Sequence, residues 1–127
     1  MFSVTVDLEH GVFETAMTGL WTIDTMEEFG RAVEHAIHRI RATGRAPLSL
    51  CNYSGAMVQT QEVMAAFAAM MENPAVRSKR VAVYTDGALT RLQAKRATDE
   101  HEEFRFFTDR AEALKWLLTA DRTTMQD

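Results

Sequence analysis

Cysteine is almost absent from this chain of 127 residues, in which Cys51 is the only one. A lone cysteine cannot close an internal disulfide bond, which excludes a small scaffold held together by internal disulfides. Cys51 follows the apolar residues Leu48 and Leu50, so we expect its thiol to be buried and unreactive. Together these features predict a protein of the reducing cytoplasm.

Long hydrophobic runs are also absent. No stretch is apolar over the ~20 residues that a membrane-spanning helix needs. The first residues, Met1 to Thr5, lack the basic segment and the cleavage site of a secretory signal. We therefore expect no integral membrane segment and a cytoplasmic location.

Positive charge is in deficit, because the formal net charge is -4 at pH 7. Residues 1–30 contain six acidic side chains and no Lys or Arg, whereas residues 77–96 contain six basic side chains and one acid, Asp86. An acidic chain is a poor candidate for binding nucleic acid, so we expect no nucleic-acid partner. The uneven distribution indicates either a partner surface or ordinary solvated helix faces and strand flanks.

No linker, internal repeat or low-complexity run divides the chain. The length fits one domain and is sufficient for a hydrophobic core of its own. We predict a single domain over residues 1–120 and a frayed carboxyl-terminal tail over residues 121–127.

The hydrophobic periodicity predicts alternating strands and helices. Apolar and polar residues alternate over residues 2–8 and again over 12–18, on either side of a turn at 9–11, which is typical of a hairpin. A helix follows this hairpin and each later strand, giving the order β-β-α-β-α-β-α-β-α. This order predicts an α/β domain with a mostly parallel mixed sheet that begins with the amino-terminal hairpin. The later strands are expected at 48–51, 80–85 and 103–107.

Short polar side chains mark where the helices should begin. Asp24 or Thr25 is the candidate N-cap of the first helix, because a side-chain oxygen there can accept a hydrogen bond from a free amide. Asp86 and Asp109 stand in the same position before the third and fourth helices.

A polar segment follows the central strand and precedes a helical pattern. In an α/β sheet such a segment lies at the carboxyl end of its strand, where ligand sites are built, and the start of a helix favours anions. We therefore predict a loop that binds a ligand or a protein partner. The alternative is that Asn52 and Ser54 only satisfy hydrogen bonds of a turn and a helix cap. The candidate residues are Asn52, Tyr53, Ser54, Gly55 and Asp86.

Signatures of catalysis and of metal binding are missing. The chain has no nucleophile elbow, phosphate-binding loop or zinc motif. His35 and His38 are three residues apart on one helix face but have no evident third ligand. His101 lies among acidic residues and is expected in a solvated linker. We predict no enzyme, no metal site and no cofactor.

Several large side chains have more than one interpretation. Trp21 follows the second strand and is either an exposed anchor for a partner or a lid over the sheet edge. Phe67 and Trp116 lie on apolar helix faces and are expected in the core. Methionines near the central segment either line an adaptable ligand pocket or belong to the core. They are Met57, Met64, Met70 and Met71.

The carboxyl-terminal third of the chain has a recognisable pattern. A strand at Arg80–Tyr84 is followed by Phe104–Phe107, a short polar turn and an Ala-Leu-x-Trp-Leu helix at 113–117. Together with the element order, this pattern resembles the SpoIIAA-like family of small bacterial proteins over roughly residues 2–120. The fold of that family is shared with STAS domains and is also compared with CRAL-TRIO lipid-binding domains.

The resemblance implies a function but leaves two classes open. STAS anti-sigma-factor antagonists are regulated by phosphorylation in an Asp-Ser-Ser-Gly-like motif, of which this chain retains Ser54 and Gly55. The first expectation is therefore a non-enzymatic cytosolic regulatory module that binds a protein partner, with Ser54 or Tyr53 as the phosphorylation site. The alternative is a carrier of a lipid or another small apolar ligand, which a cavity lined by Met57, Met64 and Phe67 would favour. A homodimer is left open.

Overall fold

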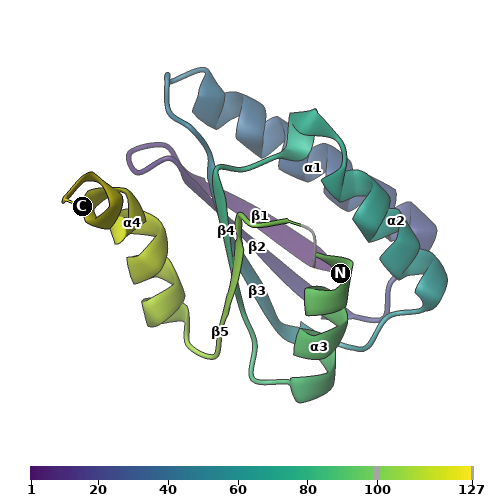
Figure 1. Ribbon diagram of the computed structural model, residues 1–127. Helices are drawn as coiled ribbons and strands as arrows, with labels where there is room; N and C mark the ends of the chain where they lie inside the picture. Colours follow the sequence, from purple (N-terminus) through teal and green to yellow (C-terminus); the bar gives the residue numbers. More distant parts are fainter. Residues whose placement is uncertain (99–100, 127) are drawn as a thin grey trace.

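The computed structural model describes residues 1–98 and 101–126, and it has the predicted order of strands and helices (Figure 1). The strands are β1 (Phe2–Asp7), β2 (Val12–Gly19), β3 (Leu48–Ala56), β4 (Arg80–Tyr84) and β5 (Phe104–Phe107). The helices are α1 (Ile23–Arg41), α2 (Gln61–Met71), α3 (Ala88–Ala97) and α4 (Arg110–Gln126), and a 3-10 turn, η1, spans Pro74–Val76.

The strands form one mixed sheet in the spatial order β1-β2-β3-β4-β5. Strands β1 and β2 are the predicted antiparallel hairpin, and every later neighbouring pair is parallel. The predicted α/β class and mostly parallel sheet are thus confirmed.

The helices cover the two faces of the sheet unequally (Figure 1). Helices α1, α2 and α3 pack on one face, over a core that includes Phe13, Phe29 and Ile37. Helix α4 alone covers the other face, where Ala113 and Leu117 pack on β3 and β4. Both sides of the sheet therefore contain apolar side chains, as expected for strands between two helical layers.

Helix α1 shows why the local sequence folds as it does. Its predicted apolar stripe is buried along its length, from Met26 to Ile40. The N-cap, however, is Thr22 rather than Asp24 or Thr25, because the Thr22 hydroxyl accepts a hydrogen bond from the amide of Thr25 at 3.2 Å. After the helix, Gly44 adopts a φ of 86°, a left-handed conformation that glycine adopts without strain.

One prediction about local structure was wrong, and another was only partly right. Strand β3 continues to Ala56, so the expected loop at 52–55 is part of the sheet. Helix α4 spans Arg110–Gln126, and the frayed tail at 121–127 stays a prediction, with residue 127 outside the described residues. Phe67 and Trp116 pack against the core but are only partly buried, whereas Ala113 and Leu117 are the side chains of α4 that are fully buried among those described. Trp116 instead lies against the Phe107 ring, with a centroid separation of 5.8 Å.

None of the helices in the described part of the chain has both the length and the hydropathy needed to cross a bilayer.

Candidate functional site

The predicted site residues 52–55 form a β-bulge. Asn52 pairs with Ala16 on β2 and Gly55 pairs with Thr18, so three steps along β3 match two along β2. The extra residue distorts the ladder locally, and the Asn52 side-chain oxygen accepts a hydrogen bond from the Ser54 amide at 3.0 Å. Asn52 therefore satisfies a local turn, as the alternative interpretation proposed.

Gly55 has a packing reason of its own. A Cβ atom at this position would lie 2.8 Å from Cγ2 of Thr18 and 3.3 Å from the Met17 carbonyl oxygen. Only a residue without a side chain allows β2 to approach so closely. The retained glycine thus fits the bulge and needs no bound phosphate to explain it.

Tyr53 and Ser54 have opposite environments. Tyr53 belongs to the core and is 4% exposed, and this burial raises the pKa of its hydroxyl. The burial argues against phosphorylation of Tyr53, because a kinase must reach both the hydroxyl and its neighbours. Ser54 is exposed and is the candidate phosphorylation site that this structure leaves accessible.

Asp86 is exposed at the end of β4, but it does not cap α3. The N-cap is Gly87, whose amide donates a hydrogen bond to the hydroxyl of Thr85 at 3.1 Å. Thr85 is fully buried and also lies 3.4 Å from the hydroxyl of Thr90. Asp109, by contrast, accepts a hydrogen bond from the amide of Ala111 at 3.1 Å and serves as the predicted start of α4.

Helix α3 has an inverted distribution of side chains. Its buried side is made of small residues spaced four apart, Thr90 and Ala94 within the helix and Thr98 at its C-cap. Its leucines point outward, since Leu89 is 69% exposed and Leu92 is 47% exposed. A surface helix normally turns its large apolar residues toward the core. The spacing of the small residues is the sequence signal that could have revealed this orientation.

Three more apolar side chains are exposed in segments that hydrogen bonds join to one another and to α3, and we call them, together with the α3 leucines, the apolar platform. Its other residues lie in the segments that follow β2 and β3, at the same edge of the sheet. The platform consists of Leu20, Met57, Val58, Leu89 and Leu92.

A buried glutamine connects the segments that make the platform. The side chain of Gln59 accepts a hydrogen bond from the Trp21 amide at 2.8 Å and donates to the carbonyls of Gly19 and Met57 at 2.9 and 2.8 Å. The backbone of Gln59 in turn exchanges two hydrogen bonds with the side chain of Gln93 on α3, at 2.8 and 2.9 Å. We call this arrangement the glutamine clasp. It fixes the platform residues of three segments relative to one another.

A hollow of about 330 Å³ lies beside α3 at the ends of β4 and β5. Arg91 and Lys95 line it, together with Asp86 and backbone and small side chains of the neighbouring turns. The Lys95 ammonium group lies 5.8 Å from the centre of the Phe106 ring. Ser54 is not among the residues that line this hollow, so the structure does not place Ser54 beside these bases.

Trp21 is neither an exposed anchor nor a lid. It is 5% exposed and packs between the rings of Phe2 and Phe29, with centroids 5.9 and 5.2 Å away. Its indole nitrogen donates a hydrogen bond to the carbonyl of Thr18 at 3.0 Å. The residue is part of the core, and its polar atom is satisfied there.

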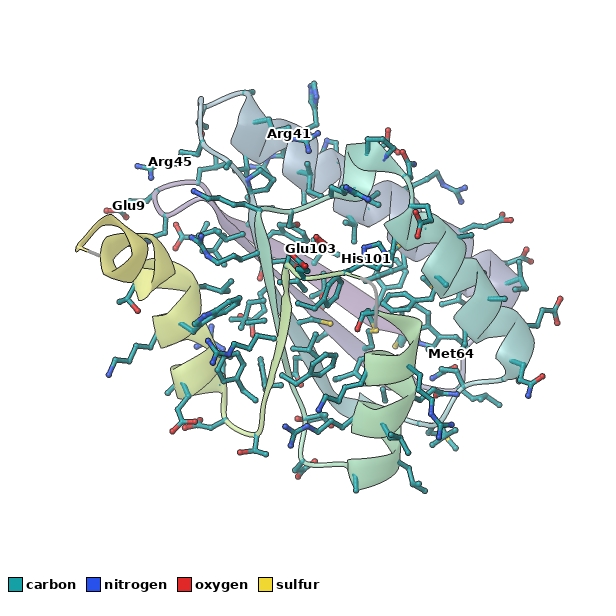
Figure 2. The ribbon with its side chains drawn as sticks, in the orientation of Figure 1. Glu9, Arg41, Arg45, Met64, His101 and Glu103 are labelled. Carbon is teal, nitrogen blue, oxygen red and sulfur yellow. The ribbon has the colours of Figure 1, made fainter. Side chains whose placement is uncertain are left out.

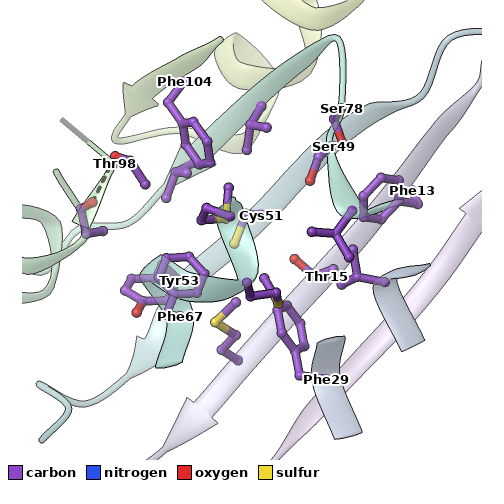
Figure 3. A pocket seen from close by; sticks show the side chains of 18 of the residues that line it. Phe13, Thr15, Phe29, Ser49, Cys51, Tyr53, Phe67, Ser78, Thr98 and Phe104 are labelled. Atoms are coloured by element: carbon purple, nitrogen blue, oxygen red, sulfur yellow. Dashed lines mark hydrogen bonds between the residues drawn. The ribbon is translucent and has the colours of Figure 1, made fainter. Parts of the chain in front are cut away.

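An apolar cavity lies between the sheet and the layer of α1, α2 and α3 (Figure 3). Its volume is about 50 Å³. Cys51 lies in its wall beside Thr15, and burial raises the pKa of the Cys51 thiol to about 11. The prediction of a buried thiol is confirmed. Phe67 lines this cavity and also, with Met64, a second space of only about 10 Å³, whereas Met57 borders neither.

A polar cluster on the opposite face of the sheet was not predicted from the sequence. Glu14 on β2 accepts two hydrogen bonds from Arg110 on α4, at 2.8 and 3.0 Å, and a third from the hydroxyl of Tyr84 at 2.9 Å. The hydrogen bonds from Arg110 hold the pKa of Glu14 below its ordinary value. Burial of Tyr84, together with its hydrogen bond to Glu14, raises the pKa of Tyr84 to about 12. The cluster attaches the start of α4 to β2. Because these residues are far apart in sequence, no local pattern reveals it.

The ionised form of Glu14 should make the stability of the fold depend on pH. The pKa of Glu14 is lower in the folded state than the ordinary value of 4.5. The contribution of ionised Glu14 to the free energy of unfolding is therefore complete above the ordinary pKa. It is lost as the pH falls through the folded-state pKa. We expect Glu14→Gln to flatten the loss of unfolding free energy between about pH 5 and about pH 3. Urea unfolding at several pH values measures this, with Glu102→Gln as the exposed control.

His35 and His38 belong to no group of three metal-binding side chains among the described residues. His35 and His38 lie on the exposed side of α1. His101 differs from our prediction, because its side chain is only 10% exposed and lies 3.3 Å from Glu72 and 3.1 Å from Glu103 (Figure 2). In the described part of the chain, Asp7, Glu9 and His10 alone bring metal-binding atoms together. They are exposed in the hairpin turn, and the His10 ring is hydrogen-bonded to Asp7.

Comparisons with known proteins establish the fold. No protein-family model and no curated protein matches the sequence. An anti-sigma factor antagonist from Mycobacterium paratuberculosis matches the structure with a TM-score of 0.61 and 16% sequence identity, over 92% of this chain and 94% of that one. An uncharacterised protein of the DUF3478 family from Shewanella loihica PV-4, which has a SpoIIAA-like fold, gives a TM-score of 0.70 and 19% identity, over 92% of both chains. The chain therefore has a SpoIIAA-like, STAS-like fold.

Proposed function

We propose that this SpoIIAA-like domain is a non-enzymatic regulatory module of the cytoplasm that binds a protein partner through the apolar platform. The observation that carries the proposal is the inverted helix α3, which buries threonine and alanine and exposes two leucines. An apolar surface held outside the core gains stabilisation when a partner covers it. One structural neighbour is an anti-sigma factor antagonist, which is a protein-binding role.

The site residues predicted from the sequence contribute less to this proposed interface than the apolar platform does. Asn52 and Gly55 build the bulge, and Tyr53 belongs to the core. Asp86 borders the hollow beside α3 that Arg91 and Lys95 line. Ser54 is exposed on the strand that leads directly to Met57 and Val58. A phosphate on Ser54 would add about -1.5 to -2 charges near the apolar platform at pH 7. We therefore keep Ser54 as the proposed point of regulation.

The alternative function, a carrier of an apolar ligand, is less well supported by the interior. A cavity of about 50 Å³ is much smaller than the ~150 Å³ cavity that holds one benzene molecule in a protein core. A lipid would require α2 and α3 to move away from the sheet. Of the expected lining, Phe67 borders this cavity, whereas Met57 and Met64 do not.

Affinity capture from extract of the native cell tests the proposal. We expect wild-type protein to recover a partner that the double variant Leu89→Ser, Leu92→Ser does not recover, because the substitutions remove the apolar contact. Leu118→Ser is the matched control, since Leu118 is an exposed leucine on α4, away from the platform. Ser54→Asp should reduce recovery and Ser54→Ala should not. Equal recovery by wild type and the double variant would contradict the proposal.

A further inference from the structure

From the surroundings of the apolar platform, we infer that its partner element is an acidic amphipathic helix that lies along α3. The inference rests on the proposed function and specifies the chemistry of the partner. Leu89 and Leu92 form an apolar ridge on the outside of α3, and Arg96 continues the same side of the helix one turn later. The ridge therefore has an apolar half and a basic half.

The charge beside the ridge favours an acidic partner. Arg91 and Lys95 are four residues apart on α3, so they lie one above the other along the hollow that borders Leu92. Asp86 is the acidic residue of that hollow, at the amino-terminal end of α3. Carboxylates spaced by one helical turn on a partner would match the two bases and remain clear of Asp86. Arg91 and Lys95 are thus expected to select the charge of the partner and the direction in which it binds.

The geometry favours a helix over an added strand. Strand addition requires a free sheet edge, and the edges of this sheet are β1 and β5. The platform instead consists of side chains from α3 and from the segments after β2 and β3. An amphipathic helix contacts such a surface through apolar residues at every third or fourth position, with its charged side facing the hollow.

The glutamine clasp makes this surface ready for binding. Gln93 lies one turn after Leu89 on α3, and its side chain is bonded to the residue that follows Val58. Both apolar groups of the platform are therefore held in place before a partner arrives. A preformed surface loses less conformational entropy on binding than a flexible one.

A pair of synthetic peptides of about 18 residues, which is about five helical turns, tests the inference. Both have the same leucine and alanine face, and the opposite face is glutamate in one and lysine in the other. Fluorescence anisotropy with the full chain should show binding of the acidic peptide, with the basic peptide at least about tenfold weaker. Raising the salt concentration should lower the affinity of the full chain for the acidic peptide. The double variant Arg91→Glu, Lys95→Glu should reverse the preference.

Matched variants separate the apolar and the charged contributions. Leu89→Ser with Leu92→Ser should abolish binding of the acidic peptide, whereas Leu118→Ser and Lys115→Glu on α4 should leave it unchanged. All substituted side chains are at least partly exposed, and unchanged melting temperatures verify that the variants fold. Equal binding of the two peptides, no binding of either, or binding only to vesicles of anionic phospholipid would overturn the inference.

The capture experiment distinguishes this inference from the proposed function. If the partner from the native extract requires Leu89 and Leu92 and is also lost with Arg91→Glu, Lys95→Glu, both are supported. If the partner requires the leucines but is retained by the charge-reversed variant, the proposed function stands and the acidic helix is excluded. If recovery requires neither pair, both fail.

Discussion

Replacement of Leu117 by alanine is expected to lower the free energy of unfolding by about 3 to 4 kcal/mol. Leu117 is 0% exposed and packs with Leu50 and Ala82 in the core between α4 and the sheet. Helix α4 alone covers this face, so no second helix can close the cavity that the substitution leaves. The loss is a large part of the total stability that a domain of this size normally has.

Leu118→Ala is the matched control, because Leu118 is the next residue on the same helix and is 40% exposed. Its replacement should change the free energy of unfolding by less than about 0.5 kcal/mol. Urea unfolding followed by circular dichroism measures both variants. Similar losses for the two leucines would show that the rotation of α4 about its axis differs from the one described.

Replacement of Gln59 by alanine is expected to cost about 2 to 4 kcal/mol, although the residue is polar and lies between a strand and a helix. Three backbone groups, at Gly19, Trp21 and Met57, lose the hydrogen bond that they make with the Gln59 side chain, and the Gly19 carbonyl keeps only a longer bond of 3.4 Å from the Met57 amide. The Trp21 amide is buried, so water cannot readily replace the lost bond. Thermal unfolding with Gln61→Ala as the exposed control measures the effect.

Gln93→Ala removes only part of the glutamine clasp and should therefore have an intermediate effect on stability. It removes the two bonds to the backbone of Gln59 but leaves the Gln59 side chain with its own partners. The expected loss is therefore smaller, about 1 to 2 kcal/mol. A Gln59→Ala variant as stable as wild type would mean that the clasp does not hold the three segments together.

The arrangement of strands and helices could be predicted because each element has a local signal. The alternation over residues 2–8 and the stripe from Met26 to Ile40 depend only on periods of two and of about 3.6 residues. Consecutive strands usually pair, and the right-handed crossover between parallel strands then sets which face of the sheet each connecting helix covers. The resemblance to the SpoIIAA-like family predicted the same fold, and the structural neighbours confirm that fold.

The details of the site could not be predicted, because they depend on contacts between distant residues. Asn52 to Gly55 look like a loop in sequence, but pairing with β2 extends the strand through Ala56, although the pairing with β4 ends at Asn52. Trp21 is polar at one atom only, and whether it is exposed depends on Phe2 and Phe29. The glutamine clasp joins residues 34 to 40 positions apart, for which no local pattern exists.

The order of strands in space is the same as their order in the chain. During synthesis on a ribosome, each new strand can therefore pair with the one that emerged just before it, without displacing any pair already made. The face formed by Leu48, Leu50 and Ala82 has no cover until α4 emerges, since that helix comes last in the chain. A nascent chain that stalls before Arg110 would present an apolar sheet face to chaperones and to other nascent chains.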